Sequence, residues 1–325
     1  MLALAIFLLI SLNSLHQLSI EQKSLDSKWL DYKLEYNLEF DESEEKTRKD
    51  IFSKNYEFIM KSNAENKSFT VKMNEFGHLD KSERAKLLTS FPVRQLRGEK
   101  SPLYVGLQIP FELDWRRARI VSPVKNQLKC GSCYAFSAVS AIESQFARYT
   151  GVLPDLSVQE IIDCSWNYSN YGCYGGFPES VYEYCMENGL STSLKYPYRG
   201  RNYQCNRNNP NSSYKLEGFK NLKEGDEDNL LRALSIIGPI SIAVDANYDE
   251  YFFYESGIID FPSCSSVYLN HAVLAVGYSL HKRPYLLVKN SWGKDWGMDG
   301  YFKIALFRNN MCGISSWATF PIAKI

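Results

Sequence analysis

The sequence is short of histidine, carries no net charge and has no long apolar run beyond its first residues. Its 37 lysines and arginines balance 37 aspartates and glutamates, so neither nucleic acid nor an anionic membrane surface is expected as the main partner. No later stretch reaches about 18 apolar residues, so we expect no membrane anchor. Metal-ligand spacings are also absent, and we expect no metal and no other cofactor.

The N-terminus has a character of its own. Residues 1–10 are almost entirely apolar and a polar run follows them, which is typical of a secretory signal and too short for a membrane span. We therefore expect residues 1–19 to be a signal peptide that directs the chain into the secretory pathway. Lysosomal or endosomal delivery and release from the cell both fit this signal. Eight cysteines in such a chain predict disulfides. We take a monomer as the default.

Cys133 lies where a polar, glycine-containing turn meets an apolar pattern of helical period. Apolar residues recur after it at steps of three and four and predict one helix that ends before Gly151: Phe136, Val139, Ile142, Phe146 and Tyr149. The start of a helix favours an anion, so this position stabilises a thiolate. A thiolate is the attacking species in nucleophilic cysteine chemistry, and Cys133 is our candidate nucleophile.

A nucleophilic thiolate needs a base, and the chain has four histidines. His16 and His78 lie in segments that we assign to processing, and His281 lies in a polar turn. His271 enters a buried type of strand, where an imidazole costs free energy unless it has a partner. Taken alone, a satisfied core histidine is the better interpretation. Asn290 follows the next strand and supplies an amide that could orient the ring, which Trp292 could shield from water.

These motifs resemble the papain and cathepsin family of cysteine proteases. The resemblance is most specific at Cys130-Gly131-Ser132-Cys133-Tyr134, at His271 and at residues 290–297. It implies an α+β fold of two lobes, one helical and one an antiparallel, β-barrel-like lobe, with the active-site cleft between them. The order of patterns along the chain agrees with such a fold, because helical patterns come before about residue 218 and strand patterns follow it. The expected strands lie at residues 240–246, 257–261, 272–278, 284–289 and 300–306.

The resemblance also implies how the cysteines pair. It joins Cys130 to Cys173, Cys164 to Cys205, and Cys264 to Cys312. Cys185 is left over, and we interpret it as a small buried hydrophobe in a helix over 178–188 that has proline at its start and Gly189 at its end.

Residues 20–108 are rich in charge, free of cysteine and patterned for helix. Seven residues on one helical face resemble the propeptide signature of the cathepsin L-like branch: Glu44, Arg48, Ile51, Phe52, Asn55, Ile59 and Asn63. Residues 69–78 resemble the second propeptide motif, with Lys72 in place of its glycine and His78 in place of its aspartate. As a hypothesis, His78 titrates between about pH 5 and 8, and an ordinary surface histidine is the alternative.

We therefore expect an inhibitory propeptide over residues 20–108, with an exposed linker at 94–106, and a peptidase over 109–325. The peptidase would have a helical lobe at about 120–218 and a β lobe at about 219–325. Ser157 opens a helix within the helical lobe through a capping box with Glu160. Three triplets fit the N-glycosylation pattern, at Asn66, Asn167 and Asn211.

The resemblance implies roles for the site residues, with peptides or proteins as substrates and the propeptide as intramolecular inhibitor. Cys133 attacks the scissile carbonyl, His271 transfers protons, Asn290 orients His271, and Gln127 donates to an oxyanion hole. Paired glycines bring backbone close to a ligand. The implied substrate-binding residues are Gly175, Gly176, Phe177, Pro178, Ala243, Leu269, Asn270, Trp292 and Trp317. The indole of Trp317 should shorten the main side-chain pocket, which favours small or medium apolar side chains.

Three residues depart from the family pattern, and three other functions compete with a peptidase. Leu128 stands where the family usually has glycine, Tyr134 where it usually has tryptophan, and Trp317 where small or acidic residues are common. A catalytically inactive, protease-like binding protein is the main alternative. Cys130 and Cys133 also form a Cys-x-x-Cys pair, which would suit a thiol–disulfide oxidoreductase, and a purely structural, disulfide-stapled protein is the third alternative.

Overall fold

A computed structural model describes residues 25–89, 98–207 and 214–325, and the expected signal peptide lies outside these ranges. The chain divides into two compact units. Of the described residues, the first unit contains 25–61 and 73–80, and the second contains 62–72 and everything from residue 81 onward. Across the three described ranges, no helix combines the length and apolar character needed to span a membrane.

The first unit is built on two helices, one over residues 25–35 and one, α2 (Glu42–Ala64), that continues into the second unit. Trp29, Tyr32 and Phe52 form its aromatic core. Asn55 Nδ2 donates to the Gly77 carbonyl at 2.9 Å, so a residue of the helical signature fixes the loop that follows. His78 is buried, with its Nδ1 3.0 Å from the Tyr32 hydroxyl, which rules out the surface histidine of the alternative interpretation.

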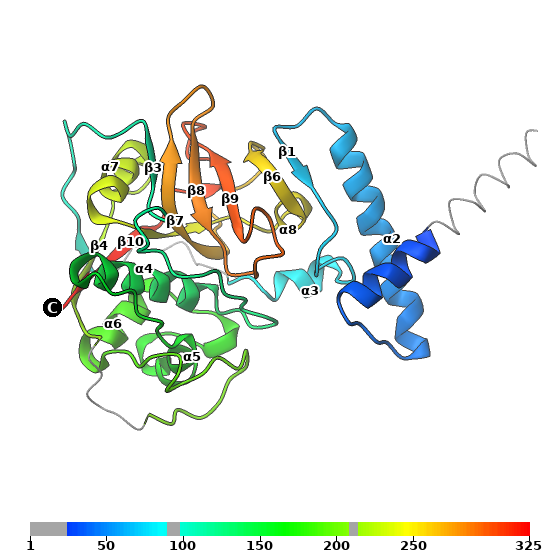
Figure 1. Ribbon diagram of the computed structural model, residues 1–325, viewed down its shortest axis with the longest axis horizontal. Coiled ribbons are helices and arrows are strands. Elements are labelled where there is room, and N and C mark those ends of the chain that lie inside the picture. The colour runs from blue at the N-terminus through cyan, green and yellow to red at the C-terminus, as the bar shows by residue number, and fades with distance from the viewer. Residues whose placement is uncertain (1–24, 90–97, 208–213) are drawn as a thin grey trace, which may run out of the picture. The chain divides into compact units, whose positions relative to one another are not determined.

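The second unit contains the remaining elements (Figure 1). Its helices are α3 (Lys81–Ala85), α4 (Cys133–Thr150), α5 (Val158–Cys164), α6 (Pro178–Asn188), α7 (Glu227–Ile237) and α8 (Asp249–Phe252), with short 3-10 turns at Trp166–Tyr168, Gly172–Tyr174 and Met311–Gly313. Its strands are β1 (Phe69–Val71), β2 (Glu99–Lys100), β3 (Glu112–Asp114), β4 (Leu216–Asn221), β5 (Ile240–Val244), β6 (Tyr254–Ile259), β7 (His271–Ser279), β8 (Tyr285–Lys289), β9 (Tyr301–Ala305) and β10 (Ala318–Ala323).

Local sequence signals explain three of these helices. The helix of Cys133 ends at Gly151, whose φ of 74° is left-handed and whose N–H donates to the Ala147 carbonyl. The Ser157 side chain accepts from the Glu160 N–H at 3.0 Å, which is one half of the expected capping box. The other half does not form, because the Ser157 N–H donates to the Ser191 carbonyl at 2.8 Å and the Glu160 carboxylate accepts from the Ser191 N–H. Helix α6 begins at Pro178 and is closed by Gly189.

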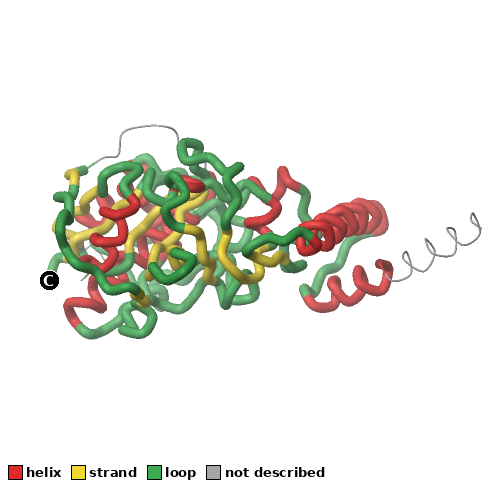
Figure 2. The backbone as a smooth tube through the Cα atoms, turned by 90° about the horizontal axis from the view of Figure 1, so that it is seen from above, coloured by secondary structure: helices red, strands yellow, loops and turns green. Residues whose placement is uncertain are grey.

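In the described part of the chain, the strands form one ten-stranded sheet in the order β1-β6-β9-β8-β7-β5-β10-β4-β2, with β3 paired to β7. Most pairs are antiparallel, but β6–β9 and β2–β4 are parallel. This path does not return on itself, so over the described residues the sheet is not closed into the barrel-like lobe that the resemblance implied. Figure 2 shows long loops among the strands and helices of the second unit.

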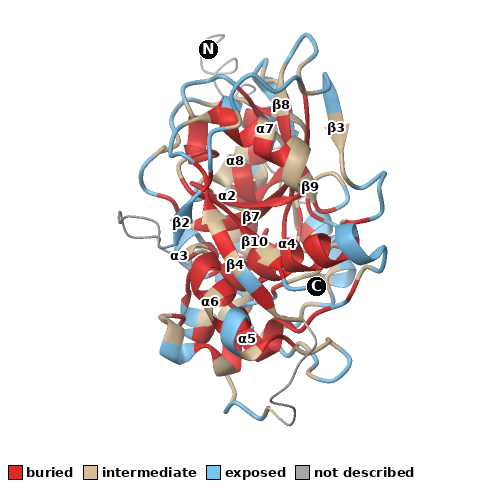
Figure 3. Ribbon diagram, turned by 90° about the vertical axis from the view of Figure 1, so that its left-hand side faces the viewer, coloured by how far each residue is buried: buried red, intermediate tan, exposed pale blue. Residues whose placement is uncertain are grey.

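The core of the second unit lies where α4 meets the sheet. Every residue of α4 from Cys133 to Ala147 is buried, and the helix packs against β7 and β10 (Figure 3). Each of the nine residues of β7 is buried as well. The first residue of α4 and the first residue of β7 are therefore both fixed by dense packing, which holds their side chains in one position.

The predicted exposed linker is partly docked. Glu99 pairs with Lys220 and Lys100 with Asn221 in a parallel register, and the Ser101 N–H donates to the Asn221 carbonyl at 2.7 Å. Residues 98–101 thus extend the sheet by one short strand, although the side chains of Glu99 and Lys100 are exposed.

Candidate active site

Cys133 is the first residue of α4 and is fully buried. Its Sγ lies 3.5 Å from Thr89 Oγ1, to which it donates. Burial raises the pKa of the Cys133 thiol, and its hydrogen bonds with the Ala272 N–H and the Thr89 side chain offset this only in part. The lowered thiol pKa expected from the helix start is therefore wrong for this covered state, because desolvation outweighs the helix terminus.

His271 is the first residue of β7 and is also fully buried. Its Nε2 lies 2.7 Å from Asn290 Oδ1, an atom that can only accept, so Nε2 carries the proton. Trp292 stacks on the ring at a centroid distance of 4.7 Å, and Tyr251 meets it edge-on. Burial lowers the pKa of His271 to about 4, against the opposing effect of Asn290. Among the described residues, none hydrogen-bonds Nδ1.

Gln127 is held by Ser291, whose hydroxyl donates to Gln127 Oε1 at 2.7 Å. This contact turns Nε2 toward two carbonyls, those of Leu87 at 2.8 Å and Cys130 at 2.9 Å. The next residue, Leu128, has a φ of 56°, a left-handed conformation that disfavours a residue with a β-carbon. The turn still forms, because Asn126 Oδ1 accepts the Leu128 N–H at 2.8 Å.

Residues 81–89, which we call the covering segment, end over the thiol. The Thr89 N–H donates to the Asn270 carbonyl at 2.7 Å, and its hydroxyl donates to the Gly131 carbonyl at 3.1 Å. Gly175 has a φ of 116°, and a β-carbon there would lie 2.8 Å from Thr89 Cγ2. The segment therefore bonds to the turn before α4 and to the residue before β7 at once, and it excludes water from the thiol.

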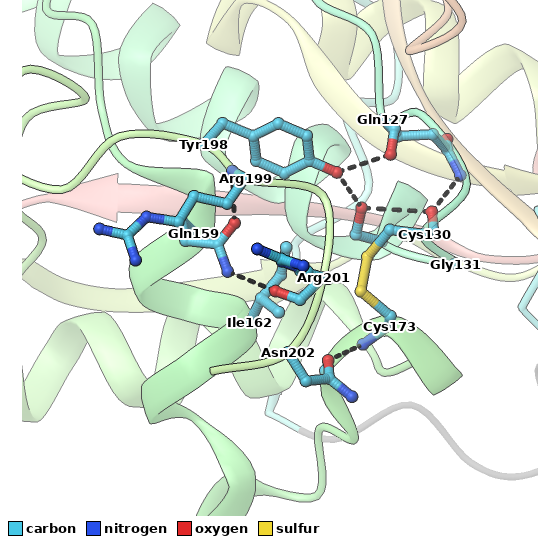
Figure 4. The surroundings of a disulfide bond; sticks show 12 residues. Gln127, Cys130, Gly131, Gln159, Ile162, Cys173, Tyr198, Arg199, Arg201 and Asn202 are labelled. Carbon is cyan, nitrogen blue, oxygen red and sulfur yellow. Dashed lines mark hydrogen bonds between the residues drawn. A yellow bond between two sulfur atoms is a disulfide. The ribbon is translucent and has the colours of Figure 1, made fainter. Parts of the chain in front are cut away.

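Figure 4 shows the disulfide between Cys130 and Cys173. The Gly131 N–H donates to the Cys173 carbonyl at 3.0 Å, and the Tyr198 hydroxyl donates to the Gln127 carbonyl at 2.7 Å. These bonds fix the turn that precedes Cys133. Since Cys130 is bonded to Cys173, it has no thiol to pair with Cys133, which argues against the oxidoreductase alternative.

The other two bridges join Cys164 to Cys205 and Cys264 to Cys312, so the three pairs are those that the resemblance implies. Cys185 is free and fully buried, and burial raises its thiol pKa well above the usual value. A buried thiol with a raised pKa is unreactive at neutral pH.

The expected substrate-binding residues lie around this constellation. Phe177 and Trp317 stack at a centroid distance of 5.8 Å and belong to the core cluster that includes Cys133, Ala243 and Leu269. Pro178 starts α6, and Trp292 covers His271. Two of the residues expected to bind substrate backbone have close neighbours. At Gly176 a β-carbon would lie 2.6 Å from the Tyr134 ring, and the Asn270 carbonyl accepts from the Thr89 N–H.

Four residues of the site were missed in the sequence. Leu87 and Thr89 lie outside both propeptide motifs, and nothing in their local pattern marks them. Ser291 sits within the motif at 290–297 and could have been found there as a hydroxyl beside Asn290. Nothing in the sequence marked Tyr251 as a residue of the site.

The expected glycosylation sites Asn66 and Asn167 are exposed, and Asn211 lies outside the described residues.

Two family models match most of the chain. Residues 109–322 match the papain family cysteine protease, and residues 29–83 match the cathepsin propeptide inhibitor domain. The chain is 40% identical to cathepsin J of Mus musculus over 308 residues, covering 91% of this chain and 92% of the relative. It is 40% identical to cathepsin L2 of Homo sapiens over 312 residues, covering 92% of this chain and 93% of the relative.

Solved structures give the same result. The structure of digestive procathepsin L 3 from the larval midgut of Tenebrio molitor aligns with a TM-score of 0.84 at 33% identity, covering 92% of this chain and 99% of that one. This match confirms the predicted α+β class and a helical region ahead of the main domain.

Proposed function

Since the chain belongs to the papain family of cysteine proteases and carries a cathepsin-type propeptide, we propose that it is a cysteine endopeptidase made as a secreted zymogen. In this proposal residues 1–19 are a signal peptide, residues 20–108 are the inhibitory propeptide, and residues 109–325 are the peptidase. Its helical lobe covers about 120–218 and its β lobe about 219–325. The protein works as a monomer in a lysosomal or endosomal compartment or outside the cell.

One observation carries the proposal. The side-chain amide of Gln127 donates to a backbone carbonyl, that of Leu87, next to the buried thiol of Cys133. The covering segment thereby offers the site the group that a peptide substrate would offer, a carbonyl within reach of a preorganised donor and a nucleophile. The inhibition follows from the same contacts, because Thr89 lies directly against Sγ.

The proposed reaction begins when the covering segment leaves and water re-enters the site. The thiol proton of Cys133 passes to His271 Nδ1, the nitrogen opposite the one that Asn290 holds. The Cys133 thiolate then adds to the scissile carbonyl, and collapse of the tetrahedral adduct breaks the C–N bond as His271 gives its proton to the leaving amine. A water molecule, deprotonated by His271, hydrolyses the thioester and regenerates the thiol.

Gln127 and the Cys133 backbone N–H would stabilise the oxyanion of each tetrahedral adduct. Ser291 supports this role because it holds Gln127 Oε1 and so fixes the direction of the amide. Asn290 positions His271, and Trp292 shields their hydrogen bond. The stacked rings of Phe177 and Trp317, with Ala243 and Leu269, would form a shallow apolar pocket for small or medium side chains, beside a backbone-binding edge at Gly175, Gly176 and Asn270.

The test is hydrolysis of a peptide amide by the matured protein. Replacing Cys133 by alanine should abolish turnover, and Gln127→Ala should lower kcat by about 100- to 1,000-fold, the usual loss for one oxyanion donor. Gln159→Ala is the matched control, since this buried glutamine bonds to Asp163 and Arg201 instead. A folded mature protein without any turnover would favour the inactive binding protein.

A further inference from the structure

A buried arginine fixes the covering segment to α8, in addition to the contacts that the segment makes at the thiol. Arg84, on α3, is only 1% exposed, and its Nη2 lies 2.5 Å from Asp249 Oδ1 at the start of α8. Lys81, one helical turn earlier, approaches Asp249 Oδ2 at 3.2 Å. Figure 1 shows α3 next to α8. Two cations at positions i and i+3 of one helix therefore share one carboxylate.

Aromatic rings complete the binding site for Arg84. The guanidinium carbon lies 5.0 Å from the ring centroid of Phe253 and 5.5 Å from that of Phe252. We call Asp249, Phe252 and Phe253 the arginine socket. A planar guanidinium can stack on a ring while its N–H groups reach a carboxylate, which an ammonium does less well.

The socket has room at its edge. A cavity of about 230 Å³ adjoins it, lined by Lys81, Ser82, Arg84, Asn247, Tyr248, Asp249 and Phe252. Tyr251, within the same helix, meets the His271 ring edge-on at a centroid distance of 6.1 Å. The socket is thus built on the aromatic layer that supports the catalytic imidazole, so a chain bound there can extend toward the active site.

We propose that, in the matured protease, the arginine socket is a secondary binding site for an arginine-bearing helical turn of a protein substrate, with a second cation three residues before the arginine. The inference rests on the proposed function, since residues 81–89 must leave. The three socket residues all follow residue 109 and stay with the peptidase. Once Arg84 departs, they present a carboxylate and two ring faces that match this one class of partner in charge and shape.

The experiment compares two quenched fluorescent peptides with the matured enzyme. One is a substrate without basic residues. The other is the same substrate joined through a glycine–serine linker to Lys-Ser-Glu-Arg-Ala-Lys, the sequence of residues 81–86, which stops before Leu87 and so lacks the residue that binds Gln127. The tag should lower KM by about fivefold and leave kcat unchanged, because it adds one ion pair and stacking contacts outside the reacting centre.

Two changes test the assignment to the socket. Arg84→Ala within the tag should remove the gain, and Asp249→Asn in the enzyme should remove it for the intact tag. Asp260→Asn is the matched control in the enzyme, because Asp260 pairs with Arg308 at 3.3 Å, and it should keep the ratio of the two KM values. A gain that survives either Arg84→Ala or Asp249→Asn, or no gain at all, would overturn the inference.

Failure of the proposed function gives a different result. If the wild type hydrolyses neither peptide, the endopeptidase proposal fails. Binding to the socket is then measured directly, from the fluorescence anisotropy of the labelled hexapeptide. Binding that Asp249→Asn weakens about fivefold would support the socket by itself. Binding that does not change in Asp249→Asn would overturn it.

Discussion

Thr89→Val should loosen the cover over the active site without altering the matured enzyme. Valine has nearly the shape of threonine but lacks its hydroxyl, which donates to the Gly131 carbonyl at 3.1 Å and accepts from Cys133 Sγ at 3.5 Å. Thr89 is buried, so the substitution leaves the Gly131 carbonyl without this partner in a place that water does not reach. An unsatisfied buried group costs about 1–3 kcal/mol.

We take about 1–2 kcal/mol as the loss in docking of the covering segment, because the Thr89 N–H still bonds to the Asn270 carbonyl. This loss corresponds to a roughly 5- to 30-fold larger fraction of proform with an open site. The assay is the rate at which a small thiol reagent alkylates Cys133 in the intact proform at neutral pH, followed by intact mass. The rate should rise by the same factor.

Thr47→Val is the matched control, because Thr47 is exposed on α2 and should leave the rate unchanged. After maturation, wild type and Thr89→Val give the same chain, so their kcat/KM values must agree. An alkylation rate in Thr89→Val within twofold of wild type would refute the account of the cover.

Substitutions at His271, Leu128 and Trp317 should each change a measurable property of the protein. Burial lowers the pKa of His271 to about 4, below its usual 6.5, so the unfolded chain binds more protons than the folded chain between these two pH values. The proform should therefore lose up to about 3 kcal/mol of stability as pH falls from 6.5 to 4. Chemical denaturation across this range should show that loss, and an equal loss in His271→Asn would contradict it. Leu128→Gly should raise the free energy of unfolding by up to about 1 kcal/mol, because relief of a left-handed leucine exceeds the entropy cost of glycine; a lower melting temperature would show that the turn is not strained. Trp317→Ala should open the apolar pocket and shift the preferred substrate side chain to larger residues, at a cost of about 3 kcal/mol in stability; an unchanged preference in a peptide-library profile would exclude Trp317 from the pocket.

Local signals in the sequence predicted the local parts of this structure. Gly151 marks the end of α4 and Gly189 that of α6, because a glycine tolerates backbone angles that other residues avoid. The period of apolar residues after Cys133 predicted a buried helix, and the continuous apolar run after His271 predicted a buried strand. Both patterns depend on neighbours within a few residues in the chain, which a single sequence contains.

Contacts between distant residues were not predictable in this way. Thr70 pairs with Ser256 at a separation of 186 residues, and neither strand shows which partner it will find. Glu99 and Lys100 extend the sheet where the sequence suggested a free linker. The Cys133 pKa was expected to fall because the helix start was visible, whereas burial by Thr89 was not. Each difference arises from residues before position 109 packing onto residues after it.

Titration of the active thiol tests the thiolate mechanism of Cys133. The proform lacking residues 1–19 is acidified and treated with an epoxide that alkylates activated thiols, and intact mass and peptide mapping then count and locate the label. We expect one label per chain, on Cys133, with peptide hydrolysis lost in proportion and Cys185 unmodified because it is fully buried. A folded, acid-treated wild type that takes up no label, or the same label in Cys133→Ala, would contradict the thiolate mechanism.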